Sequence, residues 1–171
     1  MGDQRGAALL GVLFMTVVLG LGAGVAGMSW QTVVQRAKEE ELFYRGDQYR
    51  RAIGSYFKGN RVSRTNVFPT KLEELLRDPR VPFKVRHLRK LYPDPMTGKE
   101  WEPIRDSGGK IIGVRSSSDG IPFRKDGFPE HYQDFAKAEN YADWRFIYSP
   151  EAEKSQQEAA PAPAAGIVPA P

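Results

Sequence analysis

The residue types that carry most enzyme chemistry are scarce in this chain of 171 residues. Its two histidines, His87 and His131, lie far apart, and neither has a second histidine at the spacing of a metal site. The chain has no cysteine, which excludes a thiol nucleophile, a thiolate metal site and a disulfide framework. The patterns HExxH, GxSxG, GxGxxG and the phosphate-binding loop are also absent. We therefore expect a protein that is not an enzyme, with both histidines on the surface or in loops.

Two carboxylates, Asp119 and Asp126, lie in the glycine-containing segment SSSDGIPFRKDGF. Such a loop could supply oxygen atoms to a calcium ion, but calcium takes about six to eight oxygen ligands and only these two carboxylates can be named. Asp-Gly is also an ordinary turn dipeptide. The segment is therefore interpreted as a turn, with calcium as the alternative, and no other cofactor or metal is predicted.

A basic segment covers residues 77–90, with an excess of five positive charges and one aromatic residue, Phe83. Its cations are Arg77, Arg80, Lys84, Arg86, Arg89 and Lys90. Such a patch could contact anionic lipid headgroups, an acidic partner or nucleic acid, for which affinity would fall with salt. Nothing in the segment resembles a groove-reading module, so a nucleic-acid partner is not expected. The simplest interpretation is a solvated loop whose cations pair with neighbouring acidic residues.

The elements that would position these residues begin with an apolar segment, residues 7–30, which carries no charge. As a helix it would rise about 36 Å, slightly more than the roughly 30 Å hydrocarbon core of a membrane. We therefore predict a membrane-spanning helix half. Gly11, Gly20 and Gly24 would contribute to helix packing, and the last two have the small-xxx-small spacing that lets another helix approach closely. Glycine is also common in membrane helices in general.

A cleaved secretory signal peptide is the alternative for this segment, because Arg5 precedes it and small residues surround Ala26. The apolar part of a signal peptide usually has about 7 to 15 residues. The longer segment here favours a retained membrane anchor. Charge leaves its orientation open, since basic residues lie on both sides of it.

Residues 31–58 carry apolar side chains mostly three or four positions apart and contain no proline. This pattern predicts an amphipathic helix half that continues from the first. The run Glu39–Glu41 is interpreted as a solvated face. The combined helix would be far longer than the roughly 8 to 20 residues typical of a globular protein, which indicates projection or assembly.

Residues 59–149 are expected to form one small head domain. A short second helix is predicted at residues 68–76, where Thr70 and Glu73 have capping-box spacing. Residues 150–171 are rich in alanine and proline and have no periodicity, so we predict a disordered tail there.

The strands of the head are predicted from three segments. Residues 99–105 and 110–115 flank a turn with two glycines, which predicts an antiparallel hairpin. Residues 144–148 are aromatic and strand-like, and would add a third strand. The predicted fold class is therefore α+β, with a long amino-terminal helix packed on a small antiparallel sheet.

The order of these features resembles the type IV pilin superfamily: a short leader ending in Arg5-Gly6, an apolar helix half, an amphipathic half and a small α+β head. In that family a prepilin peptidase cuts after the leader glycine and leaves the apolar segment on the mature protein. The resemblance implies a leader of residues 1–6, cleavage between Gly6 and Ala7, and methylation of the new amino terminus.

The head resembles that of type II secretion pseudopilins of the major-subunit type. The segment that carries this resemblance is Tyr92-Pro93-Asp94-Pro95-Met96-Thr97-Gly98, which is similar to the Asp-Pro turn before the hairpin in those proteins. The family usually has a glutamate at the fifth place after the cut, where this chain has Gly11. The chain is therefore identified as a divergent member.

The resemblance implies a subunit of a periplasmic pseudopilus that supports protein export. It would cross the bacterial inner membrane once, with its carboxy-terminal domain in the periplasm. Its partners would be other pseudopilins or pilins, the inner-membrane secretion platform, prepilin peptidase and membrane lipid. Two alternatives remain open: a minor pilin of a type IV pilus system, and a signal-anchored periplasmic binding module.

Overall fold

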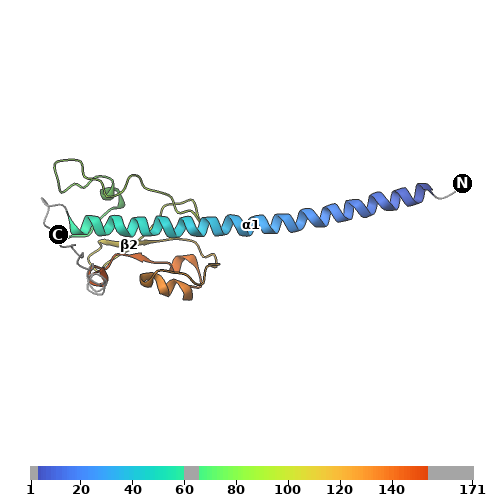
Figure 1. Cartoon of the computed structure of the whole chain (residues 1–171). Coiled ribbons are helices and arrows are strands. Elements are labelled where there is room, and N and C mark those ends of the chain that lie inside the picture. Colours follow the sequence, from blue (N-terminus) through green and yellow to red (C-terminus); the bar gives the residue numbers. More distant parts are fainter. Residues whose placement is uncertain (1–3, 60–65, 154–171) are drawn as a thin grey trace, which may run out of the picture.

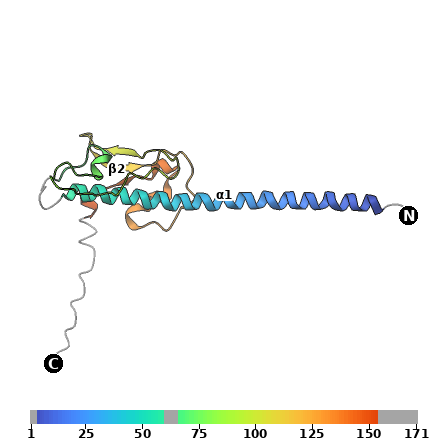
Figure 2. The ribbon, with the colours of Figure 1, turned by 90° about the horizontal axis from the view of Figure 1, so that it is seen from above.

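The computed structural model describes residues 4–59 and 66–153, with side chains described for residues 9–19, 31–59 and 66–153. It has an α+β fold in which one long helix, α1 (Gln4–Lys58), carries a small head on its carboxy-terminal half. The amino-terminal half of α1 projects well beyond the head in both views (Figures 1 and 2). The predicted long helix and small sheet are confirmed.

The sheet has three antiparallel strands in the order β1 (Glu102–Arg105), β2 (Ile111–Arg115) and β3 (Phe146–Ile147). β1 and β2 form the predicted hairpin, with Pro103 opposite Val114. Its turn is closed by the Asp106 carboxylate, which accepts hydrogen bonds from the backbone N–H groups of Gly108 and Lys110 at 2.9 and 2.8 Å. Gly109 has φ +74°, a conformation that glycine adopts without strain.

Two glycines of α1 let the head lie directly against the helix. A Cβ atom at Gly46 would overlap the ring of Phe146, and one at Gly54 would lie 2.7 Å from the ring of Tyr148. Such approaches are far below van der Waals contact, so any larger side chain would displace the sheet. The close fit places the aromatic core directly on α1.

The core combines apolar residues of α1 with aromatic residues of the head. Leu42 and Ile53 of α1 are fully buried, as are Trp144 and Phe146. The ring of Phe43 contacts a group of aromatic rings: Phe128, Tyr132, Phe135, Trp144 and Phe146. Aromatic pairs of this kind add about 0.5–1.5 kcal/mol each beyond the burial of their area.

The predicted second helix is only a single 3₁₀ turn, η1 (Leu72–Leu75), and its capping residue was predicted one position too early. The carboxylate of Glu74, rather than that of Glu73, accepts hydrogen bonds from the backbone N–H groups of Thr70 and Lys71, both at 3.2 Å. Glu74 also accepts a hydrogen bond of 2.6 Å from the Tyr56 hydroxyl. This contact with α1 favours the later position.

Two further 3₁₀ segments, η2 (Glu130–Lys137) and η3 (Tyr141–Asp143), precede β3 and were not foreseen. Order continues past the predicted start of the tail, because residues 150–153 form a helical turn. Glu153 accepts hydrogen bonds from Lys58 and Tyr148 at 2.6 and 2.8 Å. The rest of the predicted tail lies outside the described residues.

Candidate functional site

Between Leu9 and Leu19, α1 has an apolar surface that no described residue of the head covers. Its large apolar side chains between Leu9 and Leu19 are all at least 50% exposed. Soluble monomers rarely expose an apolar surface that continues over so many residues. Burying a fully exposed side chain of this size contributes about 1.5–3 kcal/mol, so covering these nine would contribute on the order of 10 kcal/mol. A nonpolar environment around these side chains would therefore be strongly favourable.

The residues predicted for helix packing and processing are described only in part. Gly11 is exposed, and apart from its own turn of helix no described atom lies within 4 Å of the position that a Cβ would take. Gly20 and Gly24 belong to α1, but the surroundings of residues 20–30 lie outside the described set. Gly6 and Ala7 lie in the first turns of α1, while residues 1–3 of the predicted leader are not described.

Within the part of the chain that the structure describes, no helical stretch combines the length and the apolar character of a membrane span. Of the predicted span, residues 7–30, side chains are described only for residues 9–19.

The turn from Tyr92 to Gly98 is organised around a buried carboxylate. Asp94 is fully buried and accepts hydrogen bonds from the backbone N–H of Met96 and from the hydroxyls of Thr97 and Ser116, at 2.9, 2.7 and 2.7 Å. Gly98 closes the turn with φ +70°, and its N–H donates to the Asp94 carbonyl at 2.7 Å. Ser116 follows β2, so Asp94 joins the turn to the sheet.

The start of this turn is attached to α1 through Tyr49. Its hydroxyl donates to the Tyr92 carbonyl at 3.0 Å and accepts from the Tyr92 N–H at 2.9 Å. Burial raises the pKa of Tyr49 to about 12, so the hydroxyl keeps its proton for the first of these bonds. The guanidinium of Arg45 lies 3.7 Å from the ring centre of Tyr92. The predicted turn motif is thus a structural connection between α1 and the hairpin.

Two residues of the basic segment are largely buried in a charged cluster. For Arg80 this contradicts the prediction of a surface patch, whereas His87 lies in a loop, as predicted. Arg80 forms a 2.7 Å ion pair with Asp78, whose side chain is fully buried, and its guanidinium also donates to the Tyr56 carbonyl near the end of α1. The side chain of His87, only 5% exposed, lies 3.4 Å from Asp78 and 2.9 Å from the Ser55 hydroxyl. Arg80 is therefore not a free surface cation, and His87 does not present its ring to solvent.

The electrostatics of this cluster follow from its geometry. The hydrogen bond from Arg80 lowers the pKa of Asp78 to about 2. Burial lowers the pKa of His87, which favours a neutral ring beside the cation. The cluster holds residues 78–87 against the end of α1, so its chemistry is structural. His131, in contrast, is exposed as expected.

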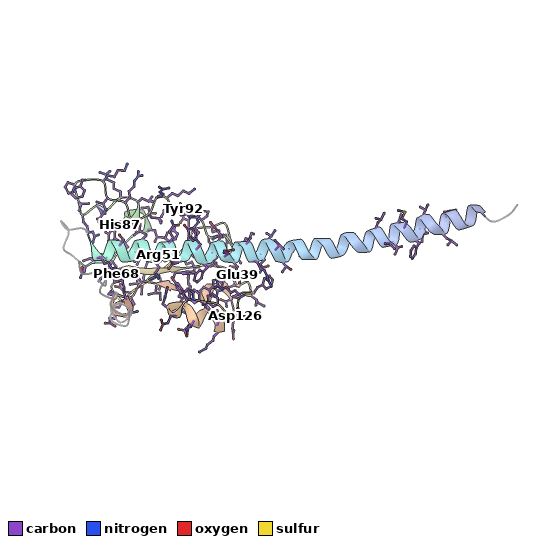
Figure 3. The ribbon with its side chains drawn as sticks, viewed as in Figure 1. Glu39, Arg51, Phe68, His87, Tyr92 and Asp126 are labelled. Carbon is purple, nitrogen blue, oxygen red and sulfur yellow. The ribbon has the colours of Figure 1, made fainter. Side chains whose placement is uncertain are left out.

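The remaining cations of the basic segment are open to solvent. Arg77, Lys84, Arg86, Arg89 and Lys90 are exposed, and none forms an ion pair with another described residue. Phe83, in the same loop, is 49% exposed. Pairing with neighbouring acidic residues, which the sequence suggested, is therefore not observed for these five side chains. Figure 3 labels His87, which belongs to the same loop, on the side of α1 opposite Asp126.

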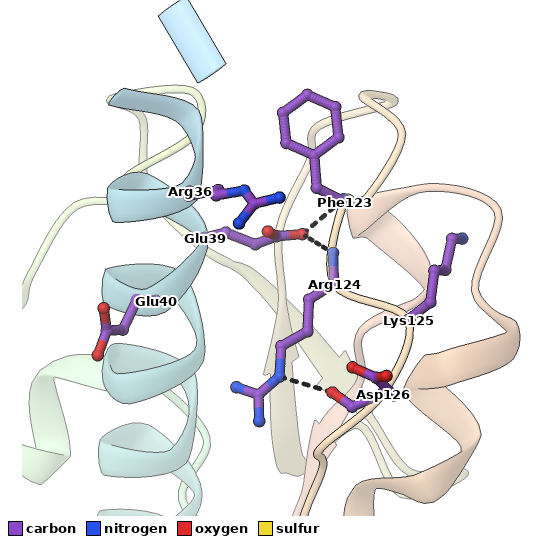
Figure 4. Close-up of a pocket in the computed structure, with 7 residues that line it drawn as sticks. All are labelled: Arg36, Glu39, Glu40, Phe123, Arg124, Lys125 and Asp126. Atoms are coloured by element: carbon purple, nitrogen blue, oxygen red, sulfur yellow. Dashed lines mark hydrogen bonds between the residues drawn. The ribbon is translucent and has the colours of Figure 1, made fainter. Parts of the chain in front are cut away.

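Glu39 holds the loop that was considered for calcium. It is buried, and its carboxylate accepts hydrogen bonds from the backbone N–H groups of Phe123 and Arg124 at 2.8 and 3.0 Å (Figure 4). The prediction that Glu39 belongs to a solvated face is therefore wrong. Its partners lie more than 80 residues away in sequence, so no local pattern could have revealed them.

This loop does not fit a calcium ion. Arg124 donates to the backbone carbonyls of Asp126 and Gly127, which places a guanidinium cation against two oxygens of the loop. Among the described residues, no group of three or more His, Cys, Asp or Glu side chains is placed to hold a metal. Glu39 and Asp126 line a surface pocket between α1 and this loop (Figure 4). Arg36, Arg124 and Lys125 line the same pocket and would repel a cation.

Comparison of the chain with protein-family models, with curated proteins and with solved structures found no match. Its function is therefore inferred from the residues and their geometry.

Proposed function

We propose that this chain is a non-enzymatic, pseudopilin-like subunit of a type II secretion system. The observation that carries the proposal is the unequal covering of one continuous helix of 55 residues. Its described amino-terminal side chains, Leu9 to Leu19, are exposed and mostly apolar, while Leu42 to Tyr56 pack beneath the head. A subunit held first by lipid and then by neighbouring helices needs this construction.

In this proposal residues 7–30 cross the inner membrane before assembly and pack against other subunits afterwards. Gly11, Gly20 and Gly24 would allow neighbouring helices to approach closely. Gly11 also stands where the type IV pilin superfamily usually has a glutamate. Because glycine has no carboxylate, no charge would be buried in lipid at this position. The head would lie in the periplasm, with its position fixed by the continuous α1.

The proposal is tested by the intact mass and amino-terminal sequence of the protein purified from membranes of its native host. We expect the mature chain to begin at Ala7, with a methylated amino group. A start at Met1 or near Gly27 would contradict the proposal, and would indicate an anchored or exported periplasmic module.

A matched pair of variants makes this test specific. Gly6→Leu should leave the leader attached and increase the mass accordingly, because the peptidase of the resembling family recognises the leader glycine. Gly2→Leu changes a glycine away from the cut and should be processed as in the wild type. Deleting the gene in the host should then leave exported proteins in the periplasm, whereas loss of surface pili with normal export would indicate a minor pilin.

A further inference from the structure

The exposed cations of residues 77–90 form a preformed surface. We define the basic surface as Arg77, Lys84, Arg86, Arg89 and Lys90. Backbone hydrogen bonds hold the loop: the Asp78 N–H donates to the Val85 carbonyl at 3.1 Å, and two successive N–H groups, those of His87 and Leu88, donate to the Leu75 carbonyl at 2.9 Å. The buried Asp78–Arg80 pair holds it from beneath. Binding through such a surface loses little backbone entropy, and the entropic cost is confined to the long cationic side chains.

The membrane that would hold this chain is out of reach of the basic surface. The loop contacts α1 through Ser55 and Tyr56, some 25 residues after the end of the predicted span, which is about 38 Å along the helix. Charges are screened over about 8 Å at physiological salt. Lipid headgroups of that membrane are therefore not the partner that the position of the loop favours.

An acidic surface lies on the opposite side of α1. We define it as Glu130, Asp134, Glu139 and Asp143, which are all exposed and form no ion pair with a described residue. The stretch 124–145 that contains it carries five carboxylates and four cations, so its net charge is −1. The cations are Arg124, Lys125, Lys137 and Arg145. Figure 1 shows the basic loop, in green, on one side of α1 and this segment, in orange, on the other.

We propose that the basic surface of one copy docks on the acidic surface of the next copy. Two different surfaces of the same chain then meet, and such a contact continues into an open filament when its rotation does not close a ring. This inference rests on the proposed function, because it assigns the contact between heads in the assembled subunit.

The two surfaces are also displaced along α1. Tyr141 and Tyr132 contact α1 through Gln35 and Asp47, whereas the basic loop contacts α1 at Ser55 and Tyr56. The centres of the two surfaces thus differ by on the order of 20 Å at about 1.5 Å per residue. Docking would shift each copy along the axis of its neighbour, as a helical filament requires.

Charge in the head also has a role that the apolar half cannot fill. Residues 7–30 contain no charged side chain that could set the register between subunits. Complementary charges fix register and suppress wrong pairings more than they add affinity. Contacts between heads would therefore select the alignment of helices that the apolar surface alone leaves unspecified.

The absence of cysteine allows a direct test by disulfide cross-linking of the full chain in membranes of its host. One tagged copy carries Pro82→Cys beside the basic surface, and a differently tagged copy carries Gln133→Cys beside the acidic surface. We expect a cross-linked pair on oxidation. Two copies that both carry Pro82→Cys are the matched control and should not cross-link, because two basic surfaces repel each other. Equal cross-linking in both combinations would overturn the proposal.

Charge reversal supplies the second part of the test. Arg86→Glu with Arg89→Glu should reduce the cross-link at least tenfold, and so should Asp134→Lys with Glu139→Lys. Pairing a copy whose basic surface is reversed with a copy whose acidic surface is reversed should restore the cross-link. A control that reverses two cations outside the basic surface, Lys38→Glu with Lys99→Glu, should leave it unchanged. A cross-link that survives the single reversals, or that the combination does not restore, overturns the proposal.

Two measurements separate this inference from its premises. Thermal unfolding of the reversed variants should match the wild type, because the changed residues are exposed and form no ion pair with a described residue. The reversed variants should still mature to a chain that begins at Ala7, because leader cleavage does not depend on contacts between heads. If they do while the Pro82–Gln133 pair never forms, the docking surface is wrong and the proposed function stands. The reversed variants could also associate with each other as well as the wild type does, while only the wild-type basic surface binds anionic vesicles or duplex DNA. That result would overturn the proposal and identify lipid or nucleic acid as the partner of the basic surface.

Discussion

The two halves of α1 differ in what surrounds them rather than in their backbone. In the carboxy-terminal half Leu42 and Ile53 are fully buried, and Gly46 and Gly54 admit aromatic rings of the head. In the amino-terminal half every large apolar side chain from Leu9 to Leu19 is at least half exposed, and the space beside Gly11 is open apart from its own turn of helix. The carboxy-terminal half packs against the head, whereas the described side chains of the amino-terminal half have no such cover.

The largest expected effect is the difference between replacing a glycine that the head covers and replacing one that it does not cover. Gly46→Leu should lower the free energy of unfolding of the head by about 3 kcal/mol, because its side chain would overlap the Phe146 ring. Gly11→Leu should change it by less than about 0.5 kcal/mol, since the space beside Gly11 is open apart from its own turn of helix. Urea unfolding of the full chain in detergent, followed by tryptophan fluorescence, measures both. Similar values for the two variants would remove the contrast between the halves.

Acid should weaken the end of α1 that meets the head. The pKa of Asp78 is about 2 when folded and 3.8 ordinarily, so its contribution is present above about pH 4 and is lost as the pH falls toward 2. The difference corresponds to about 2 kcal/mol. His87 acts in the same direction, because its lowered pKa makes protonation below about pH 6.5 oppose folding.

The variant Asp78→Asn isolates the carboxylate. It should be less stable at pH 7, because Arg80 loses its charged partner, and its stability should fall less than that of the wild type between pH 5 and pH 2. Denaturant unfolding at several pH values gives both quantities. Parallel pH profiles for the two proteins would show that Asp78 does not account for the acid sensitivity.

A smaller effect is expected at the turn that joins α1 to the hairpin. Ser116→Ala removes one of three hydrogen bonds to the buried Asp94 carboxylate and should lower the free energy of unfolding by about 1.5 kcal/mol. Ser117→Ala is the matched control, because no hydrogen bond of its hydroxyl is described, and it should be nearly neutral. Equal losses in the two serine variants would mean that Asp94 does not organise the turn.

The local parts of the fold were predictable from the sequence. The glycines between the two segments of the hairpin indicated a turn, and Gly109 has the positive φ that such a turn needs. The aromatic segment 144–148 contains β3. Helix periodicity without proline correctly predicted that α1 continues through residues 31–58. Each of these signals lies within a few neighbouring residues.

The contacts that join distant segments were not predictable in this way. A count of charges along residues 77–90 could not distinguish Arg80, which pairs with a buried carboxylate, from Lys84, which faces solvent. Glu39 was assigned to a solvated face because its partners come from a loop far along the chain. Gly46 was not recognised because a glycine inside a helix does not reveal which ring will pack against it.

The uninterrupted helix also fixes the angle by which the head is rotated, about the axis of α1, relative to the apolar half. α1 runs without a break from Gln4 to Lys58, so the direction in which the head faces is determined by the rotation of the apolar half about the helix axis. At about 3.6 residues per turn, one residue inserted between the halves would rotate the head by about 100° while moving it only about 1.5 Å along the axis. The number of residues that join the two halves is therefore constrained as strictly as their chemistry.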